Sequence, residues 1–210
     1  MSPKQQRGEL TAELLLDTAL RLYAADGPRG VTVGAVTRAS GVSAGSLYHH
    51  FGSVEGLVAA LTDRWLGRLL GDLLTSLRGA RTARTGIRAL VLAYLAFVDE
   101  HRDAALLLHS ATADRRTMEQ GKVLRDAQEA RLSAFAGWAQ QFVTSGELAP
   151  LSMPLIESLA LGPVVGVARR WLSGTGDVDL GEAARVLPER IWLSLAAARG
   201  PAVPTTVEAQ

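Results

Sequence analysis

The sequence lacks cysteine, which excludes several kinds of chemistry at once. With no thiol among its 210 residues, disulfide frameworks, thiolate nucleophiles and cysteine-ligated zinc are excluded, and a reducing compartment is expected. The four histidines are scattered without metal-ligand spacing, and no Ser/His/Asp constellation or phosphate-binding glycine loop is visible. We therefore expect no enzymatic activity, no cofactor and no metal. An all-helical enzyme acting on an apolar substrate is the alternative from the enzyme class.

A strong net charge and long apolar runs are also missing. The formal net charge is +1, so any nucleic-acid binding must come from a local surface. The most apolar later stretch, LALGPVVGVA (159–168), is about half the length needed to span a bilayer. The polar start MSPKQQRGEL is not typical of a secretory signal. These features predict a cytoplasmic protein.

What the sequence does contain is helical periodicity along nearly its whole length. Hydrophobic residues make up 48% of the chain and charged residues 20%, which predicts a globular protein with a sizeable core. No alternating pattern typical of a β-strand is present. We predict an all-α fold of about nine helices, over 11–25, 33–39, 44–50, 87–102, 103–111, 115–146, 154–174 and 179–198, with a further long helix that Ser53 caps and that helix-breaking residues within 78–86 end.

The segment TVGAVTRASGVSAGSLYHHF (32–51) has the pattern of a helix-turn-helix. Thr32 and Ser43 are expected to cap its two short helices, and Gly41 is expected at the centre of the turn. Val36 and Leu47, with Val42 of the turn, are predicted to point inward against the first helix. The remaining residues of the second helix then face outward.

The outward residues fit a recognition helix that enters the major groove of DNA. Side-chain bulk is nearly absent from its first turn, so the backbone can approach the bases closely. Gly45 costs about 1 kcal/mol of helix propensity relative to alanine, and close approach to DNA would offset this cost. Tyr48 can donate its hydroxyl to a phosphate oxygen. The alternative interpretation is a tolerated surface glycine, a half-buried tyrosine and solvated histidines.

The stretch LLLDTALRLYAADGPRGVTVGAVTRASGVSAGSLYHHFGSVEGLVAAL (14–61) resembles the N-terminal domain of the TetR family of bacterial transcriptional regulators. This resemblance implies a homodimer whose three-helix heads bind a pseudo-palindromic operator, and a variable C-terminal body that holds a small-molecule pocket. It therefore also implies association with the nucleoid when DNA is bound. At the matching positions it implies DNA contacts from Thr32, Ser43, Ala44, Gly45, Ser46, Tyr48, His49 and His50.

Three departures from the family pattern affect these expectations. Val54 stands where the family usually has lysine, so one phosphate-contacting cation is missing and the salt dependence of DNA binding should be shallower. Thr37 and Ser40 replace two common alanines and are expected to be tolerated. The segment with Lys4 and Arg7 is either a flexible DNA-contacting arm that supplies the missing charge or a disordered terminus.

We expect a DNA-binding domain over residues 1–52 and a ligand-binding and dimerisation domain over residues 53–210. The candidate pocket residues of the second domain are mostly aromatic, which predicts an apolar ligand, multi-ring or acyl, and His109 is the polar candidate among them. The alternative is that they are ordinary core residues. The candidates are Trp65, Tyr94, Phe97, Leu107, His109, Met118, Phe135, Trp138, Phe142 and Trp171.

The last two predicted helices are the candidate dimer interface. An apolar stripe runs along the last helix, and two glycines one turn apart bare the backbone of the helix before it, so two helices per chain would form a four-helix bundle. The alternative is that these faces pack only within their own chain. Pro163 and Pro188 are expected to kink or break the two helices. The candidates are Leu159, Gly162, Gly166, Leu180, Ala184, Leu187, Ile191 and Leu195.

Together these features predict a repressor of the TetR type that binds double-stranded DNA as a homodimer and is released by a small, largely apolar molecule. The alternative is a helical ligand-binding or interaction protein of the same fold with weak or lost DNA binding. The near-zero charge balance and Val54 keep that alternative open.

Overall fold

The computed structural model describes residues 3–110 and 129–197. These residues form nine α-helices, one 3-10 turn and no strand beyond an isolated antiparallel bridge between Leu148 and Ala196. The prediction of an all-α fold is therefore confirmed. The elements are α1 (Pro3–Asp26), η1 (Gly27–Gly30), α2 (Val33–Ser40), α3 (Ala44–Phe51), α4 (Val54–Leu77), α5 (Ala83–Glu100), α6 (Arg102–Ser110), α8 (Glu129–Thr144), α9 (Met153–Leu172) and α10 (Leu180–Leu195).

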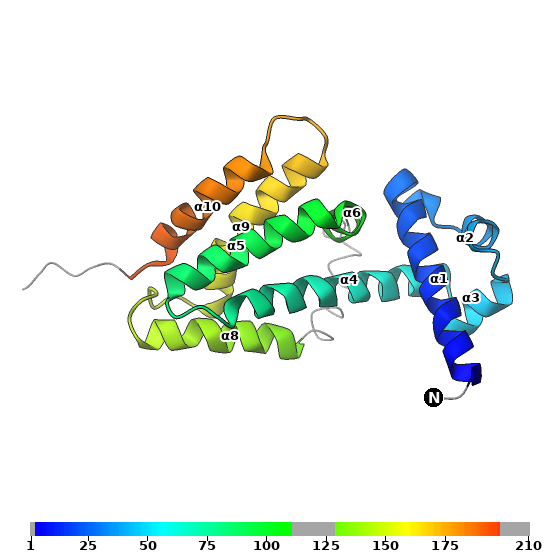
Figure 1. The fold of residues 1–210 in the computed structure, drawn as a ribbon, viewed down its shortest axis with the longest axis horizontal. Helices are drawn as coiled ribbons and strands as arrows, with labels where there is room; N and C mark the ends of the chain where they lie inside the picture. Colours follow the sequence, from blue (N-terminus) through cyan, green and yellow to red (C-terminus); the bar gives the residue numbers. More distant parts are fainter. Residues whose placement is uncertain (1–2, 111–128, 198–210) are drawn as a thin grey trace, which may run out of the picture.

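A small head and a larger body lie at opposite ends of the molecule. Figure 1 shows α1, α2 and α3 gathered at one end, with α4 running from them into the body of α5, α6, α8, α9 and α10. Of the helices in the described ranges, none has the length and apolarity required to cross a membrane.

Side-chain caps begin the helices that follow the first loop. The hydroxyl oxygens of Thr32, Ser43 and Ser53 accept hydrogen bonds from backbone N–H groups three residues ahead, at 3.2, 3.2 and 3.0 Å. Each bond satisfies a donor that has no partner inside its helix. All three caps were predicted from the sequence and are confirmed.

Two helices begin earlier than predicted. α1 starts at Pro3, and Thr11 lies inside it, donating its hydroxyl to the Arg7 carbonyl at 2.9 Å. The segment with Lys4 and Arg7 is therefore helical, and neither flexible nor disordered. Its contact with DNA stays a prediction. α5 starts at Ala83 because Thr82 and Thr85 form a capping box. The predicted helix began only at residue 87, because residues 78–86 were interpreted as helix-breaking.

Two internal prolines are accommodated without ending their helices. Pro163 lies inside α9 and Pro188 inside α10, and both helices continue past them. A proline removes one hydrogen bond from the ladder, and a helix held by its buried face against α5 tolerates this loss. The helices are therefore not broken at these positions, and the predicted kinks near them stay a prediction.

Two hydrophobic clusters form the core, and α4 contributes to both. Leu57 and Leu61 of α4 are fully buried with the residues of the head, whereas Leu69 and Leu73 belong to the larger cluster of the body. Leu107 of α6 is also fully buried in the head cluster. A division of the chain after residue 52 stays a prediction, since the head is completed by helices that follow it.

Candidate nucleic-acid interface

The helix-turn-helix is closed by hydrogen bonds from its own residues. Gly41 has a positive φ of 71° and donates its N–H to the Thr37 carbonyl at 2.9 Å, the left-handed conformation that favours glycine. In the turn, Val42 donates its N–H to the Ser40 hydroxyl at 3.1 Å. Thr37 donates its own hydroxyl to the Val33 carbonyl at 2.8 Å. The two departures from alanine, Thr37 and Ser40, are therefore absorbed by local hydrogen bonds.

Apolar side chains fix the orientation of α3. Val36 of α2 and Leu47 of α3 are fully buried, as are Leu15 and Ala19 of α1, against which the pair packs. Val42 is partly buried beside them. Because Leu47 must face inward, the opposite side of α3 faces solvent.

The predicted DNA-contacting residues lie on this solvent side. Tyr48 is 50% exposed, and Ser43, Gly45 and His49 are exposed as well. Thr32, at the start of α2, is also exposed, and Ala44, Ser46 and His50 are partly buried. The structure thus brings the predicted set together at the N-terminal ends of α2 and α3 and along α3.

Gly45 has no role within the chain that requires glycine. A Cβ atom built on it would meet only the Ser43 hydroxyl oxygen, at 3.9 Å, which is ordinary contact. Its φ does not lie in the positive range that side chains avoid. The structure of the chain itself therefore gives no reason for glycine at this position.

The two capping hydroxyls keep a free donor. The oxygens of Thr32 and Ser43 accept the capping bonds, but a hydroxyl that accepts can also donate its own hydrogen. Each is exposed at a helix N-terminus, where unpaired N–H groups and the helix dipole favour an anion. A phosphate group would find suitable donors at both positions.

The start of α4 is less suited to a phosphate. Val54, which stands where the family usually has lysine, is partly buried against the head cluster and carries no charge. Hydrogen bonds from its own backbone N–H and from Ser53 lower the pKa of the Glu55 carboxyl. A carboxylate therefore already occupies the anion-favouring end of this helix.

Positive charge reaches the head surface from other helices. Arg38 is exposed in the last turn of α2 and is the only lysine or arginine between Thr32 and Val54; that count was available from the sequence, but its importance was overlooked. The start of α1 passes α3, since a Cβ on Gly8 would lie 3.8 Å from His50 Cε1. Arg7, next to Gly8, is exposed.

Comparison with known proteins places this head in a family. Residues 15–61 match the family model described as bacterial regulatory proteins, tetR family. The head of this chain therefore has the N-terminal domain of the TetR family.

The relatives agree with this assignment. The chain is 34% identical over 89 residues to the HTH-type transcriptional regulator BetI of Rhizobium meliloti (strain 1021), covering 42% of this chain and 44% of that protein. It is 33% identical over 93 residues to the HTH-type transcriptional repressor KstR2 of Rhodococcus jostii (strain RHA1), covering 44% and 46%. The match thus spans less than half the length of these curated relatives.

The fold similarity extends over nearly the whole chain. A crystal structure of a TetR family transcription regulator from Marinobacter aquaeolei VT8 superimposes with a TM-score of 0.75 at 21% identity, covering 92% of this chain and 99% of that one. The body of this chain therefore shares the fold of that structure, as the head does.

The candidate pocket residues of the body do not gather in one place. Leu107 is fully buried in the head cluster, so it does not line a pocket of the body. Arg102 lies over the ring of Trp171, 4.6 Å from its centroid. Trp65 and Phe97 form an aromatic cluster with ring centroids 6.2 Å apart. Met118 lies outside the described residues.

The polar candidate His109 is paired with Tyr94. The Tyr94 hydroxyl and His109 Nε2 are 3.2 Å apart. Burial raises the pKa of Tyr94 to about 12. Burial, together with the positive charge of Arg169, lowers the pKa of His109 to about 4. Both side chains are therefore uncharged at neutral pH and form a polar contact between α5 and α6.

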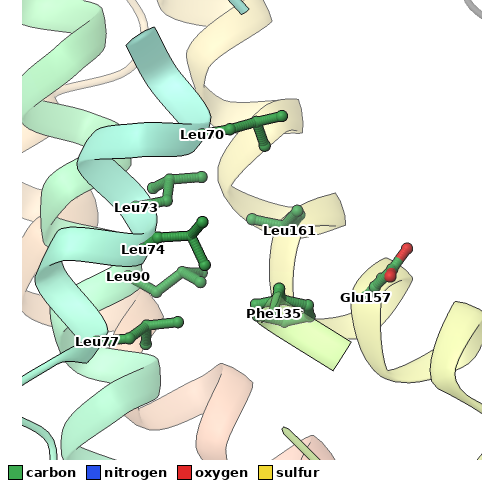
Figure 2. A pocket seen from close by; sticks show the side chains of 8 residues that line it. All are labelled: Leu70, Leu73, Leu74, Leu77, Leu90, Phe135, Glu157 and Leu161. Atoms are coloured by element: carbon green, nitrogen blue, oxygen red, sulfur yellow. The ribbon is translucent and has the colours of Figure 1, made fainter. Parts of the chain in front are cut away.

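A groove lies between α4, α8 and α9 in the described body (Figure 2). Of the predicted pocket residues only Phe135 lines it. The leucines of α4 were not among the predicted pocket residues, because sequence periodicity does not distinguish a core face from a groove wall. Its lining is Leu70, Leu73, Leu74, Leu77, Leu90, Phe135, Glu157 and Leu161.

Two further aromatic candidates are held by packing along α8. Trp138 and Phe142 have ring centroids 5.2 Å apart, and the Trp138 ring lies against Gly86 of α5. A Cβ on Gly86 would be 2.1 Å from Trp138 Cζ2, so glycine is required here by tertiary contact. The contact between Gly86 and Trp138 could not be predicted from the sequence, because the two residues are far apart in the chain.

The predicted dimer stripe is largely internal. Ile191 and Leu195 are 2% and 1% exposed in the single chain, so their assignment to the dimer interface is corrected: they belong to the chain's own core. Leu180, Ala184 and Leu187 pack partly buried against the same core, as does Leu159. Gly162 and Gly166 are exposed, with nothing within 4 Å of an added Cβ.

Proposed function

We propose that this TetR-family regulator is a homodimeric repressor that binds a pseudo-palindromic operator through α3 and leaves it when a small molecule binds the body. The observation that carries the proposal is the solvent-facing side of α3. It combines the exposed N-cap Ser43, almost no side-chain bulk on the first turn and the exposed Tyr48 on the second. The exposed N-cap Thr32 of the neighbouring α2 adds a second hydroxyl. A cytoplasmic location is part of the same proposal.

The roles proposed for these residues follow from their positions. Thr32, Ser43 and Tyr48 donate to phosphate oxygens and set the position of the head on DNA, as do the exposed His49 and the partly buried His50. Ala44, Gly45 and Ser46 face the base edges, where small side chains permit close approach. Arg38 and Arg7 supply cations that the start of α4 lacks.

The dimer is proposed to form through the outer faces of α9 and α10, which lie side by side in the body (Figure 1). This face carries exposed apolar residues, with Leu155 45%, Val186 46% and Leu193 60% exposed. Gly162 and Gly166 lie on the same side of α9 as Leu155 by helical spacing. Pairing this face with a second copy would remove its apolar surface from water.

Release from DNA is proposed to pass through α6. This helix places Leu107 in the head core, and its Ser110 hydroxyl lies 2.7 Å from the Tyr23 hydroxyl of α1. Two residues from Leu107, His109 contacts Tyr94 of the body. A ligand that displaces α6 would therefore act on both regions at once.

An electrophoretic mobility shift with the DNA upstream of the protein's own gene tests the proposal. We expect a discrete complex that survives excess non-specific DNA, and at least about tenfold weaker binding by Tyr48→Ala, because a hydrogen bond to a charged group is lost. Asp72→Ala, at an exposed position of α4 in the body, is the control. A folded protein that shows no preference for any operator-like DNA would indicate a helical binding protein that has lost DNA recognition.

A further inference from the structure

The groove between α4, α8 and α9 is lined almost entirely by apolar side chains. Its lining consists of six leucines, Phe135 and a single ionisable residue, Glu157. The volume of the groove is only about 40 Å³, well below the ~300–1,000 Å³ usual for ligand pockets. It therefore suits a short apolar chain that lies along the open groove, and not a ligand enclosed on all sides.

Glu157 lies at the rim of the groove. Figure 2 shows it on α9, on the far side of Phe135 from the leucines of α4. Its side chain is partly buried. In the described part of the chain, no hydrogen bond or ion pair involves its carboxylate, and no lysine, arginine or histidine is among the lining residues.

We propose that this groove binds a small aliphatic molecule carrying one amine, with its ammonium group beside the Glu157 carboxylate and its hydrocarbon part on the leucines. This ligand class deepens the function proposed above and rests on it only for the claim that the ligand acts as an effector. Burial of methylene groups supplies most of the affinity. The charge of Glu157 supplies the selection among ligands with the same hydrocarbon part.

Charge complementarity favours this class over acids. A carboxylate or phosphate ligand in the groove would face Glu157, and the described lining residues include no cation to offset the repulsion. A neutral alcohol would gain the apolar contacts alone. The expected order of affinity is therefore amine, then alcohol, then acid.

Isothermal titration calorimetry of the full chain without DNA, at pH 7 and low salt, tests this order with n-octylamine, 1-octanol and octanoate. A partly exposed ion pair contributes up to about fivefold in affinity. We therefore expect octylamine to bind about fivefold more tightly than octanol, and octanoate to bind more weakly than either.

Three variants locate the effect at Glu157. Glu157→Gln is expected to reduce octylamine affinity to that of octanol and to leave octanol unchanged. Glu157→Lys is expected to reverse the preference, so that octanoate binds more tightly than octylamine. Glu182→Gln, which removes the same charge from the exposed start of α10, is the control and is expected to retain the wild-type order.

The outcomes separate this inference from the proposed function. Equal affinity for the three ligands, preference of the wild type for octanoate, no binding of octylamine, or an unchanged preference in Glu157→Lys would each overturn the amine site. None of these results bears on operator binding, which is measured by the mobility shift. An amine site in a protein that does not bind DNA would instead contradict only the proposed function.

Discussion

The head and the body of this protein are both helical, but they differ in how far apart in the sequence their determining contacts lie. In the head, α2 and α3 are eight residues long, and each begins with a hydroxyl cap three residues from its partner. In the body, Gly86 accommodates Trp138 from a helix about 50 residues later in the sequence. Local chemistry thus shapes the head, whereas distant packing decides which body residues are buried, exposed or near a ligand.

The strongest test of this comparison places the same substitution at two neighbouring positions of α10. Ile191→Glu introduces a carboxylate at a position that is 2% exposed in the single chain. We expect it to destabilise the fold by about 4 kcal/mol or more, because the charge is buried without a partner. Leu193→Glu, at a 60% exposed position, is expected to leave the chain folded but weaken the dimer.

Urea unfolding and light scattering at low micromolar concentration distinguish these outcomes. A stable, dimeric Ile191→Glu would show that the core assignment of α10 is wrong. A fully dimeric Leu193→Glu would place the dimer contact on another face.

A pair of glycine substitutions compares the head with the body directly. Gly86→Ala is expected to lower the free energy of unfolding by about 1–3 kcal/mol, because the Trp138 ring must move. Gly45→Ala is expected to raise it by up to about 1 kcal/mol, because alanine favours helix and meets no close neighbour. Thermal denaturation of the two variants side by side measures both effects, and equal signs would contradict the distinction.

The same Gly45→Ala variant sharpens the role of the recognition helix. If glycine is present to let the backbone approach DNA, the more stable protein should bind the operator more weakly. Operator affinity from fluorescence anisotropy checks this expectation. Unchanged affinity would support the simpler view of a tolerated surface glycine.

Acidification should weaken the body through His109. The folded-state pKa of about 4 lies below the ordinary value of 6.5, so between these values the unfolded chain binds more protons than the folded one. Stability is therefore complete above pH 6.5 and falls as the pH drops toward 4. Because the ring is only partly buried, solvent screening limits the loss to about 1–2 kcal/mol.

Urea unfolding at pH 7.5 and pH 5.0 measures the contribution of this pair. His109→Asn is expected to reduce the difference between the two pH values, whereas the control His49→Asn on the exposed side of α3 is expected to leave it unchanged. An equal pH dependence in wild type and His109→Asn would exclude His109 as the source.

The smallest expected effect concerns the hydroxyl of Tyr48. Tyr48→Phe keeps the ring and removes only the proposed phosphate donor, so we expect up to about tenfold weaker operator binding with no change in stability. Because the contact is to phosphate, the loss should be similar for specific and non-specific DNA. A loss confined to one operator sequence would assign Tyr48 to base recognition instead.

Several features of the head could be predicted because they depend on neighbours within four residues. Thr32, Ser43 and Ser53 were identified as caps from their positions before helical patterns, and the turn at Gly41 from its glycine. The start of α1 was misplaced because Thr11, a good capping type, lies inside a longer helix. Propensity identifies candidate caps but does not decide among them when the preceding residues also form helix.

The body was predicted less well for a physical reason. Its amphipathic helices have more apolar residues than one face needs, so the sequence does not specify which of them meet. The stripe with Ile191 was assigned to a partner chain but packs within its own, and the exposed Val186 and Leu193 on the other side were overlooked. Leu107 was assigned to the body but completes the head core.

The sequence by itself determined the helical class, the helix-turn-helix, its caps and the outward face of α3, because short-range hydrogen bonds and the period of the apolar residues fix these features. Only the tertiary structure decided that α4 and α6 complete the head, that Gly86 accommodates Trp138, and that leucines with Glu157 line a groove. These features depend on how helices distant in sequence lie against one another. Apolar burial drives that packing, and because it is non-directional, the sequence does not specify which apolar residues meet.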